Sequence, residues 1–467
     1  MAITPVSHSG GELPPAGADG TSQIIVVSDF HMSAGVDPAS GTPDPHEYFR
    51  DDEAFVHFLE HLAQRGRHEA RTWRLVILGD FLDFLHVPPP TGRGLLARRD
   101  TSEAAMLAKL DRIATGHRRV FASLGEFAAS GSRVVVVPGN HDLELIRSST
   151  QARFCELVDE ACGQPGAATR IEFQPWIYYV PGVLYAEHGS QYHDINSVEQ
   201  LLRRRDGAEN GADALLGSLL TLYLLELDDV VGVGQDLGPP GRRALRALRS
   251  RPGLALRTLG IQGAFLGAAG RLLLDLLDPR RPRGRVSYWP ELDAYARALG
   301  IDAQAVRAID RLAYVPALGV EKRALHTLAH VLLRRAERAL AAGTRRTGQP
   351  LPAHEASDSL TEAAGAIHRL LAAAGQSVPY YVLGHTHRAR VAGLVAAASR
   401  PQYANCGTWS LLVPRGADPS TSRFTFVEIT RARTNADPVL RLVRWNDADR
   451  REESATEVKG DQATLAS

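Results

Sequence analysis

The run from Leu75 to Phe84, LVILGDFLDF, constrains the fold of this chain more than any other segment. Four consecutive aliphatic residues that stop at Gly79 are typical of a strand buried on both faces of a sheet. Asp80 then stands at the carboxyl end of that strand. Ligands of open α/β sheets bind at this edge, so we expect Asp80 to belong to a functional site.

Several other strand-like runs also end in polar motifs. These motifs are Ser28-Asp29-Phe30-His31, Gly139-Asn140-His141-Asp142, Glu187-His188-Gly189 and Gly384-His385-Thr386-His387. Because the carboxyl ends of parallel strands meet at one edge of a sheet, we expect the side chains to lie together. The donors expected at this edge are Asp29, His31, Asp80, Asn140, His188, His385 and His387.

This set of oxygen and imidazole donors is larger than one ion usually takes from a protein, and it suits two divalent ions. Asp80 is the natural bridge, because a carboxylate has two oxygens that can each face one ion. Two ions about 3.5–4 Å apart clamp a reacting group and generate a hydroxide nucleophile near neutral pH. Oxygen and imidazole donors without a thiolate favour Mn²⁺, Fe or Zn²⁺ over Ca²⁺. Of these metals we expect Mn²⁺ first.

Helical patterns join these strands. Apolar residues at helical spacing over 51–62, with Gly66 as the stop, and a stretch over 102–129 predict two right-handed crossover helices. Residues 171–180 and 183–186 predict two strands joined by a tight turn. From Ser377 onward, runs bounded by turns predict a second, largely antiparallel sheet. These runs are residues 379–383, 391–396, 403–413, 424–429 and 439–445.

Residues 201–377 lack this strand pattern, and Leu, Ala and Arg recur there at helical spacings. We interpret this region as a large helical insertion, or cap, close to the expected donors. Its arginine groups, such as Arg203-Arg204-Arg205, either lie on solvated helix faces or bind an anionic substrate through bidentate contacts. The apolar stretch 254–277 either packs within the cap or contacts lipid at a membrane surface.

Composition bears on location. The chain has 467 residues, of which 44% are hydrophobic, so we expect a sizeable core. Residues 1–22 are rich in Gly, Pro and Ser and lack a signal-peptide pattern, so we expect a disordered arm, and residues 446–467 read as a polar tail. No stretch reaches the roughly 18 uninterrupted apolar residues of a membrane span. Three cysteines are too few for a disulfide framework, and we expect a cytoplasmic protein with no transmembrane segment.

The motifs, in this order, resemble the calcineurin-like metallophosphoesterases over residues 23–200 and 378–445. The resemblance implies an α/β fold: a two-sheet sandwich flanked by helices, here with the helical insertion. It implies a first metal on Asp29, His31, Asp80 and His387, and a second on Asp80, Asn140, His188 and His385. It also implies attack by metal-bound hydroxide, assisted by the non-ligand His141, with Asp142 orienting that imidazole.

A narrower resemblance is to the bacterial UDP-diacylglucosamine pyrophosphohydrolases and their relatives. It is carried by the Gly79-Asp80-Phe81-Leu82-Asp83 segment, by Asn405-Cys406-Gly407-Thr408-Trp409 and by Arg388 after the last histidine motif. The chain departs from that branch at His141, where the branch typically has Arg, and in its large insertion. The resemblance implies a phosphoester or pyrophosphate bond in a phosphorylated small-molecule or lipid-linked substrate.

Some residues near the motifs have open roles. We expect Asp83 to hold a histidine ligand rather than to bind metal itself. Arg388 either contacts substrate phosphate or forms a surface salt bridge. His46, His86 and His193 also lie near motifs, although no motif selects them.

Two other functions remain as alternatives. The first is a nuclease of the same superfamily that uses the basic insertion to bind nucleic acid, with steep salt dependence as its signature. We favour it less, because its basic residues are not interleaved with aromatic ones. The second is a non-catalytic scaffold that keeps the sandwich, and the complete donor set argues against it.

Overall fold

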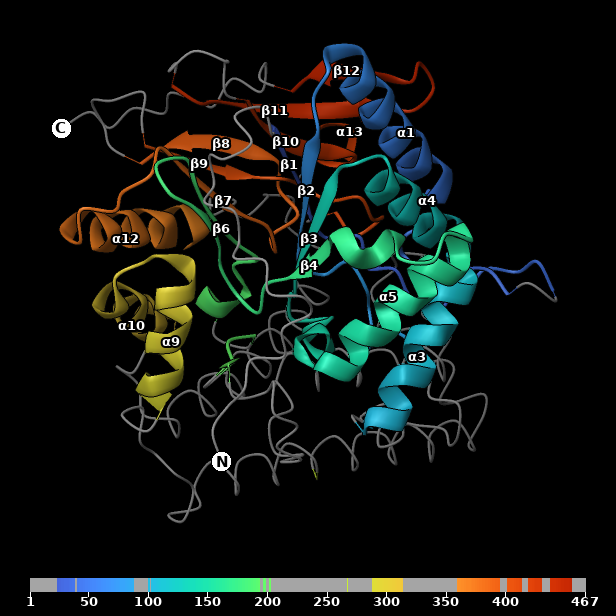
Figure 1. The fold of residues 1–467 in the computed structure, drawn as a ribbon, viewed down its shortest axis with the longest axis horizontal. Helices are drawn as coiled ribbons and strands as arrows, with labels where there is room; N and C mark the ends of the chain where they lie inside the picture. Colours follow the sequence, from blue (N-terminus) through green and yellow to red (C-terminus); the bar gives the residue numbers. More distant parts are fainter. Residues whose placement is uncertain are drawn as a thin grey trace, which may run out of the picture.

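The computed structural model describes residues 23–37, 40–87, 100, 102–193, 196–198, 201–202, 267, 288–313, 359–394, 401–413, 419–430 and 437–455. The expected N-terminal arm, most of the expected insertion and residues 456–467 of the expected tail lie outside these ranges. Figure 1 shows two sheets at the centre, with helices flanking them.

The first sheet has seven strands in the order β12-β11-β10-β1-β2-β3-β4. Four of them run parallel: β1 (Gln23–Val27), β2 (Trp73–Leu78), β3 (Arg133–Val137) and β4 (Ile171–Phe173). The other three are antiparallel neighbours: β10 (Thr425–Thr430), β11 (Val439–Asn446) and β12 (Arg451–Ser454). The parallel strands are almost continuous apolar runs because both of their faces are covered.

The second sheet has five strands in the order β5-β6-β7-β9-β8. Their bounds are β5 (Tyr178–Val180), β6 (Leu184–Glu187), β7 (Tyr380–Leu383), β8 (Arg390–Gly393) and β9 (Gln402–Asn405). The central strands β6, β7 and β9 are parallel, whereas β5 and β8 pair antiparallel at the edges. The carboxyl ends of β6 and β7 therefore lie at the same edge of this sheet.

Alternating side chains of the strands build three apolar layers. Ile24 and Val26 of β1 pack toward the second sheet, where they meet side chains such as Val382. Ile25 and Val27 point the other way, into a layer formed with α1 (Asp52–Glu69), α3 (Glu103–Gly116), α4 (Arg118–Ala129) and α5 (Ser148–Cys162). The outer face of the second sheet is covered by α9 (Trp289–Leu299), α10 (Ala303–Ala313) and α12 (Ser359–Ala373). Short helices are η1 (Leu143–Ile146), η2 (Ala167–Arg170), η3 (Ser190–Tyr192) and α13 (Pro419–Ser422).

The predicted α/β two-sheet sandwich flanked by helices is confirmed, but two details of the strand pairing were wrong. The strands after residue 377 do not form a separate antiparallel sheet, because β10, β11 and β12 extend the first sheet through β1. Residues 171–180 are not one strand either. They divide into β4 in the first sheet and β5 in the second. An alternating pattern identifies a strand, but it does not identify the strand with which it pairs.

The helix predictions also needed adjustment. Helix α1 runs through Gly66, where any Cβ would crowd the indole of Trp73, and it ends before Ala70 in the left-handed conformation. The stretch 102–129 forms two helices that meet at His117. Helices α9, α10 and α12 fall in the range expected for the insertion, and they pack on the second sheet. The boundaries of the insertion stay a prediction. None of the helices in the described ranges is long and apolar enough to cross a membrane.

Candidate metal centre

The loops after β1, β2, β3, β6 and β7 carry the expected donors, and backbone hydrogen bonds join these loops. The N–H of Asp29 donates to the carbonyl of Gly79 (3.1 Å), and the N–H of His31 donates to the carbonyl of Asp80 (2.8 Å). Across the second sheet, the N–H of Gly384 donates to the carbonyl of His188 (2.9 Å). Segments distant in sequence are thereby held at one edge of the sandwich.

The backbone at this edge is strained. Eight non-glycine residues in the described part of the chain have positive φ, and five of them are predicted ligands. These five are Asp29, His31, Asp80, His385 and His387, with φ between 50° and 66°. Left-handed residues of this kind cost free energy, and they gather at functional sites where the surrounding structure holds them.

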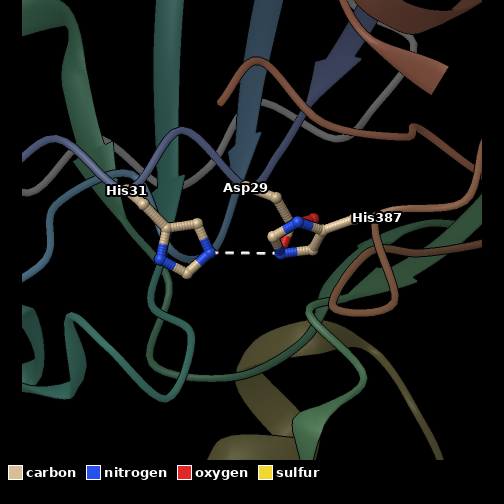
Figure 2. A group of neighbouring side chains, drawn as sticks. All are labelled: Asp29, His31 and His387. Carbon is tan, nitrogen blue, oxygen red and sulfur yellow. Dashed lines mark hydrogen bonds and ion pairs between the residues drawn. The ribbon is translucent and has the colours of Figure 1, made fainter. Parts of the chain in front are cut away.

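Asp29, His31 and His387 form the first donor group (Figure 2). The Nε2 atoms of His31 and His387 are 3.1 Å apart, and Nε2 of His387 lies 3.2 Å from Oδ1 of Asp29. Nδ1 of His31 donates to Oδ2 of Asp83 (3.0 Å), and Nδ1 of His387 donates to the carbonyl of Leu412. In a neutral ring whose Nδ1 carries the proton, Nε2 presents a lone pair.

This group fits a cation. In their neutral form the two imidazoles present lone pairs beside the carboxylate oxygen, and these atoms repel one another unless a positive charge, a proton or a metal ion, lies between them. Oδ1 of Asp29 is buried and has no hydrogen-bond donor among the residues that the structure describes. The other oxygen, Oδ2, is occupied by the Ser28 hydroxyl (2.6 Å) and by the N–H of His385 (3.0 Å). The unpaired oxygen is therefore the one that faces His387.

Asp80, His188 and His385 form the second group, and Asn140 borders it. Nδ1 of His188 donates to the carbonyl of Leu78 (2.9 Å), which leaves its Nε2 facing Oδ2 of Asp80 and Oδ1 of Asn140, both at 3.2 Å. Oδ2 of Asp80 also lies 3.7 Å from Nε2 of His31. One carboxylate oxygen thus faces both donor groups.

The expectation that the two oxygens of Asp80 each face a different ion is wrong in this detail. Its Oδ1 accepts the backbone N–H of His141 (2.8 Å), so only Oδ2 is directed toward the histidine ligands. Gly139 is required here, because a Cβ at this position would collide with the Asp80 carboxylate. The loop after β3 therefore fixes the orientation of Asp80.

Electrostatics keep the carboxylates charged and some of the imidazoles neutral. Burial would raise the pKa of Asp80, but the charges of His188 and His141 hold that pKa well below its usual range. Burial lowers the pKa of His31, and the charge of His141 lowers it further. Burial also holds the pKa of His385 well below its usual value, together with the charge of His188. Burial lowers the pKa of His188, but the charge of Asp80 outweighs this effect and raises that pKa to about 10, and the charge of Asp29 likewise outweighs burial and raises the pKa of His387. The ionised carboxylates and the neutral rings of His31 and His385 are in the protonation states that metal binding requires, and a metal ion would displace a proton at His188 and His387.

His141 belongs to two further groups that could hold a cation, one with His31 and Asp80 and one with Asp83 and His86. Its hydrogen-bond partner differs from the expected one. Nδ1 of His141 is 2.9 Å from Oδ2 of Asp83. Burial lowers the pKa of His141, but the charges of Asp83 and Asp80 outweigh this effect and raise it to about 9. Asp142, which we expected to orient His141, instead accepts backbone N–H groups from Gly139 (2.6 Å) and Phe81 (2.8 Å). That expectation was wrong, because the Asp142 carboxylate ties the loops after β2 and β3 together.

Asp83 contacts three imidazoles. Its contact with a histidine ligand was expected, whereas its contacts with His141 and His86 were not. Its Oδ2 accepts hydrogen bonds from Nδ1 of His31, His141 and His86. The only sequence signal for His86 was its position three residues after Asp83 in a turn. Arg388 is exposed, so its proposed contact with phosphate stays a prediction.

The second donor group also has a neighbour that no motif selects. Nδ2 of Asn196 lies 2.9 Å from Nδ1 of His193 and 3.4 Å from Nε2 of His385. The rings of His193 and His385 are 5.4 Å apart. These residues connect the segment after β6 to the predicted ligands.

Comparison with known protein families identifies the chain. Residues 22–257 match the calcineurin-like phosphoesterase family. The chain belongs to this family. Its members are generally metal-dependent phosphoester hydrolases that typically bind two divalent ions, and the clustered His and Asp side chains are compatible with that chemistry. A search of curated proteins found no match to the chain.

Proposed function

We propose that this calcineurin-like phosphoesterase is a dinuclear enzyme that hydrolyses a phosphoester or pyrophosphate bond. The observation that carries the proposal is the position of the Asp80 carboxylate. Its Oδ2 lies 3.2 Å from Nε2 of His188 and 3.7 Å from Nε2 of His31, between two separate donor groups. The unpaired Oδ1 of Asp29 supports the first of these two sites.

Each proposed ion has its own set of ligands. The first set is Asp29, His31, Asp80 and His387, and the second is Asp80, Asn140, His188 and His385. Divalent ions bound there would lower the pKa of a water molecule and offset the negative charge of a phosphate group. Nδ1 of His31, His188 and His387 each donates a hydrogen bond to an oxygen, and these bonds orient the rings so that Nε2 is the nitrogen directed toward the proposed ions.

His141 is the proposed general acid. Its side chain is 15% exposed, whereas those of His31 and His188 are 3% exposed, so among these three His141 is the one that faces solvent. Because Nδ1 is bonded to Asp83, Nε2 is the nitrogen that can reach a substrate. It donates its proton to the leaving oxygen as the bond to phosphorus breaks.

Substitution of Asp80 by Asn tests the proposal. The purified protein is stripped with a chelator and reconstituted with Mn²⁺, Fe²⁺ or Zn²⁺. We then measure hydrolysis of three substrates: a chromogenic monoester, a chromogenic diester and a nucleotide-sugar pyrophosphate. The metal content of each protein is measured in parallel. We expect Asp80→Asn to lose metal and at least about 100-fold in activity, because the shared ligand is weakened. Asp111→Asn, a change at a half-exposed aspartate on α3, is the control. Wild-type activity in Asp80→Asn contradicts the proposal.

The same panel separates the alternatives. A nuclease would cleave nucleic acid in preference to the three small substrates, and a scaffold would bind no metal. Most of the arginines on which the nuclease alternative depends lie outside the described residues, so the structure offers it no support. Mn²⁺, a lipid-linked pyrophosphate substrate and a cytoplasmic location remain predictions.

A further inference from the structure

His86 is placed against the proposed acid by several independent contacts. It lies in the turn after β2, and its backbone N–H donates to Oδ1 of Asp83 (3.1 Å) while its Nδ1 contacts Oδ2 of the same carboxylate. Its ring stacks on that of His141, with centroids 5.9 Å apart and an interplanar angle of 22°. The side chain is only 6% exposed, so these contacts are shielded from solvent.

The loop between His31 and α1 supports His86 from outside. The ring of His46 stacks on it (6.4 Å, 25°), and the ring of Tyr48 meets it edge-on (5.2 Å, 68°). His86 therefore fills the space between this loop and His141. A ring packed on several sides has few alternative rotamers, and it restricts the rings that it touches.

The contacts of His141 show what this packing achieves. The His141 ring stacks on His86 and also meets the His31 ring edge-on, with centroids 4.6 Å apart. Its third constraint is the hydrogen bond from Nδ1 to Asp83. Asp83 is held in turn through Oδ1 by backbone N–H groups and through Oδ2 by imidazole donors. His86 takes part in two of the three constraints, since it both touches the ring and binds its carboxylate partner.

We propose that His86 is a positioning residue for the general acid: it holds the Asp83 carboxylate and the His141 ring so that Nε2 of His141 points at the leaving oxygen. The inference rests on the proposed function. The reaction is unchanged: the proton moves from Nε2 of His141 to the leaving oxygen as that oxygen separates from phosphorus. His86 contacts Asp83, which is not one of the predicted ligands, so bound metal is measured in each variant to separate positioning from metal binding.

Two variants separate the two contacts of His86. His86→Phe keeps an aromatic ring for the stack and removes the Nδ1 donor. His86→Asn keeps an N–H donor close to the position of Nδ1 and removes the ring. His68→Gln, an exposed change on α1, is the matched histidine control. Each protein is assayed on a series of aryl esters that differ in the pKa of the leaving group. The esters belong to the class that the wild type hydrolyses. The metal content of each protein is measured as well.

A positioning role for the acid predicts a loss that depends on the leaving group. With His86→Phe we expect kcat to fall about 10-fold or more for poor leaving groups and less than about 3-fold for p-nitrophenolate, which needs little protonation. We expect His86→Asn to show the same selectivity with a smaller loss, and both variants to keep the wild-type metal content. His68→Gln should match the wild type throughout.

Other outcomes overturn the inference. A loss by the same factor for all leaving groups, or a loss of bound metal, in either variant would show a general structural role. Wild-type kinetics in both variants would show no role. If one variant does not fold, the other decides by the same criterion. Failure of the proposed function is distinguishable, because in that case the wild-type protein itself shows no metal-dependent hydrolysis.

Discussion

His117 should make the stability of this protein fall as the pH rises from neutral to alkaline. The residue joins α3 to α4, and its side chain is 2% exposed. Nδ1 lies 2.9 Å from Oδ1 of Asp52, and Nε2 lies 3.0 Å from Oε2 of Glu47. A ring that meets a carboxylate at each nitrogen must be protonated on both, so the folded state favours the imidazolium.

The size of the effect follows from the shift in pKa. Burial lowers the pKa of His117, but hydrogen bonds to Asp52 and Glu47 outweigh it and raise the pKa from 6.5 to about 9. Each pKa unit corresponds to about 1.4 kcal/mol, so the folded state gains about 3 kcal/mol from this proton. The stabilisation is complete below pH 6.5, where the unfolded chain is protonated too. It is lost as the pH rises through about 9, since the folded protein then has to release the proton.

Urea unfolding followed by tryptophan fluorescence, at pH 6 and at pH 9.5, measures this effect. Between the two pH values the free energy of unfolding of the wild type should fall by about 3 kcal/mol more than that of His117→Gln. His68→Gln, on the exposed side of α1, should follow the wild type. An equal pH dependence in the wild type and His117→Gln would refute the reasoning.

Three further outcomes are expected. Gly79→Ala should lower metal affinity by about 10–100-fold in a calorimetric titration. Gly79 has φ +84°, and a Cβ at this position would overlap the ring of His188. Trp409→Phe should lower the free energy of unfolding by about 2 kcal/mol, because Trp409 is fully buried and stacks on Phe30 at 5.4 Å. Saturating Mn²⁺, at about 100 times its Kd, should stabilise the wild type by about 2.7 kcal/mol and raise its melting temperature, but should have much less effect on Asp80→Asn.

The sequence predicted the parts of the fold that local pattern determines. The buried runs that became β1, β2 and β3 read as strands because both of their faces are covered. The partners of the strands after residue 377 depended on contacts that no local pattern contains. Ile24 of β1 pairs with Ile429 of β10, which lies about 400 residues later in the chain. The sequence therefore predicted the strands better than it predicted the sheets.

The same distinction applies to the site. The donor residues were predictable because each stands at a strand end, and parallel strand ends must meet. The partner of His141 was not predictable, since adjacency in sequence favoured Asp142 while the turn after β2 brings Asp83 to the ring. Nor could sequence indicate that His86 contacts the same carboxylate, because nothing about an isolated histidine in a turn shows the direction of its ring.

The left-handed backbone of the predicted ligands explains why the loops are so heavily cross-linked. Such a conformation costs about 1–3 kcal/mol for each non-glycine residue, so five of them together cost on the order of 5–15 kcal/mol. That cost is comparable with the whole stability of a domain, and it has to be offset by the surrounding structure. Hydrogen bonds supply this restraint. The backbone N–H groups of Asp29 and His31 donate to the loop after β2, and Asp142, on the loop after β3, accepts the N–H of Phe81 on the loop after β2. The donors are therefore oriented by the fold, and bound ions would relieve the repulsion among them.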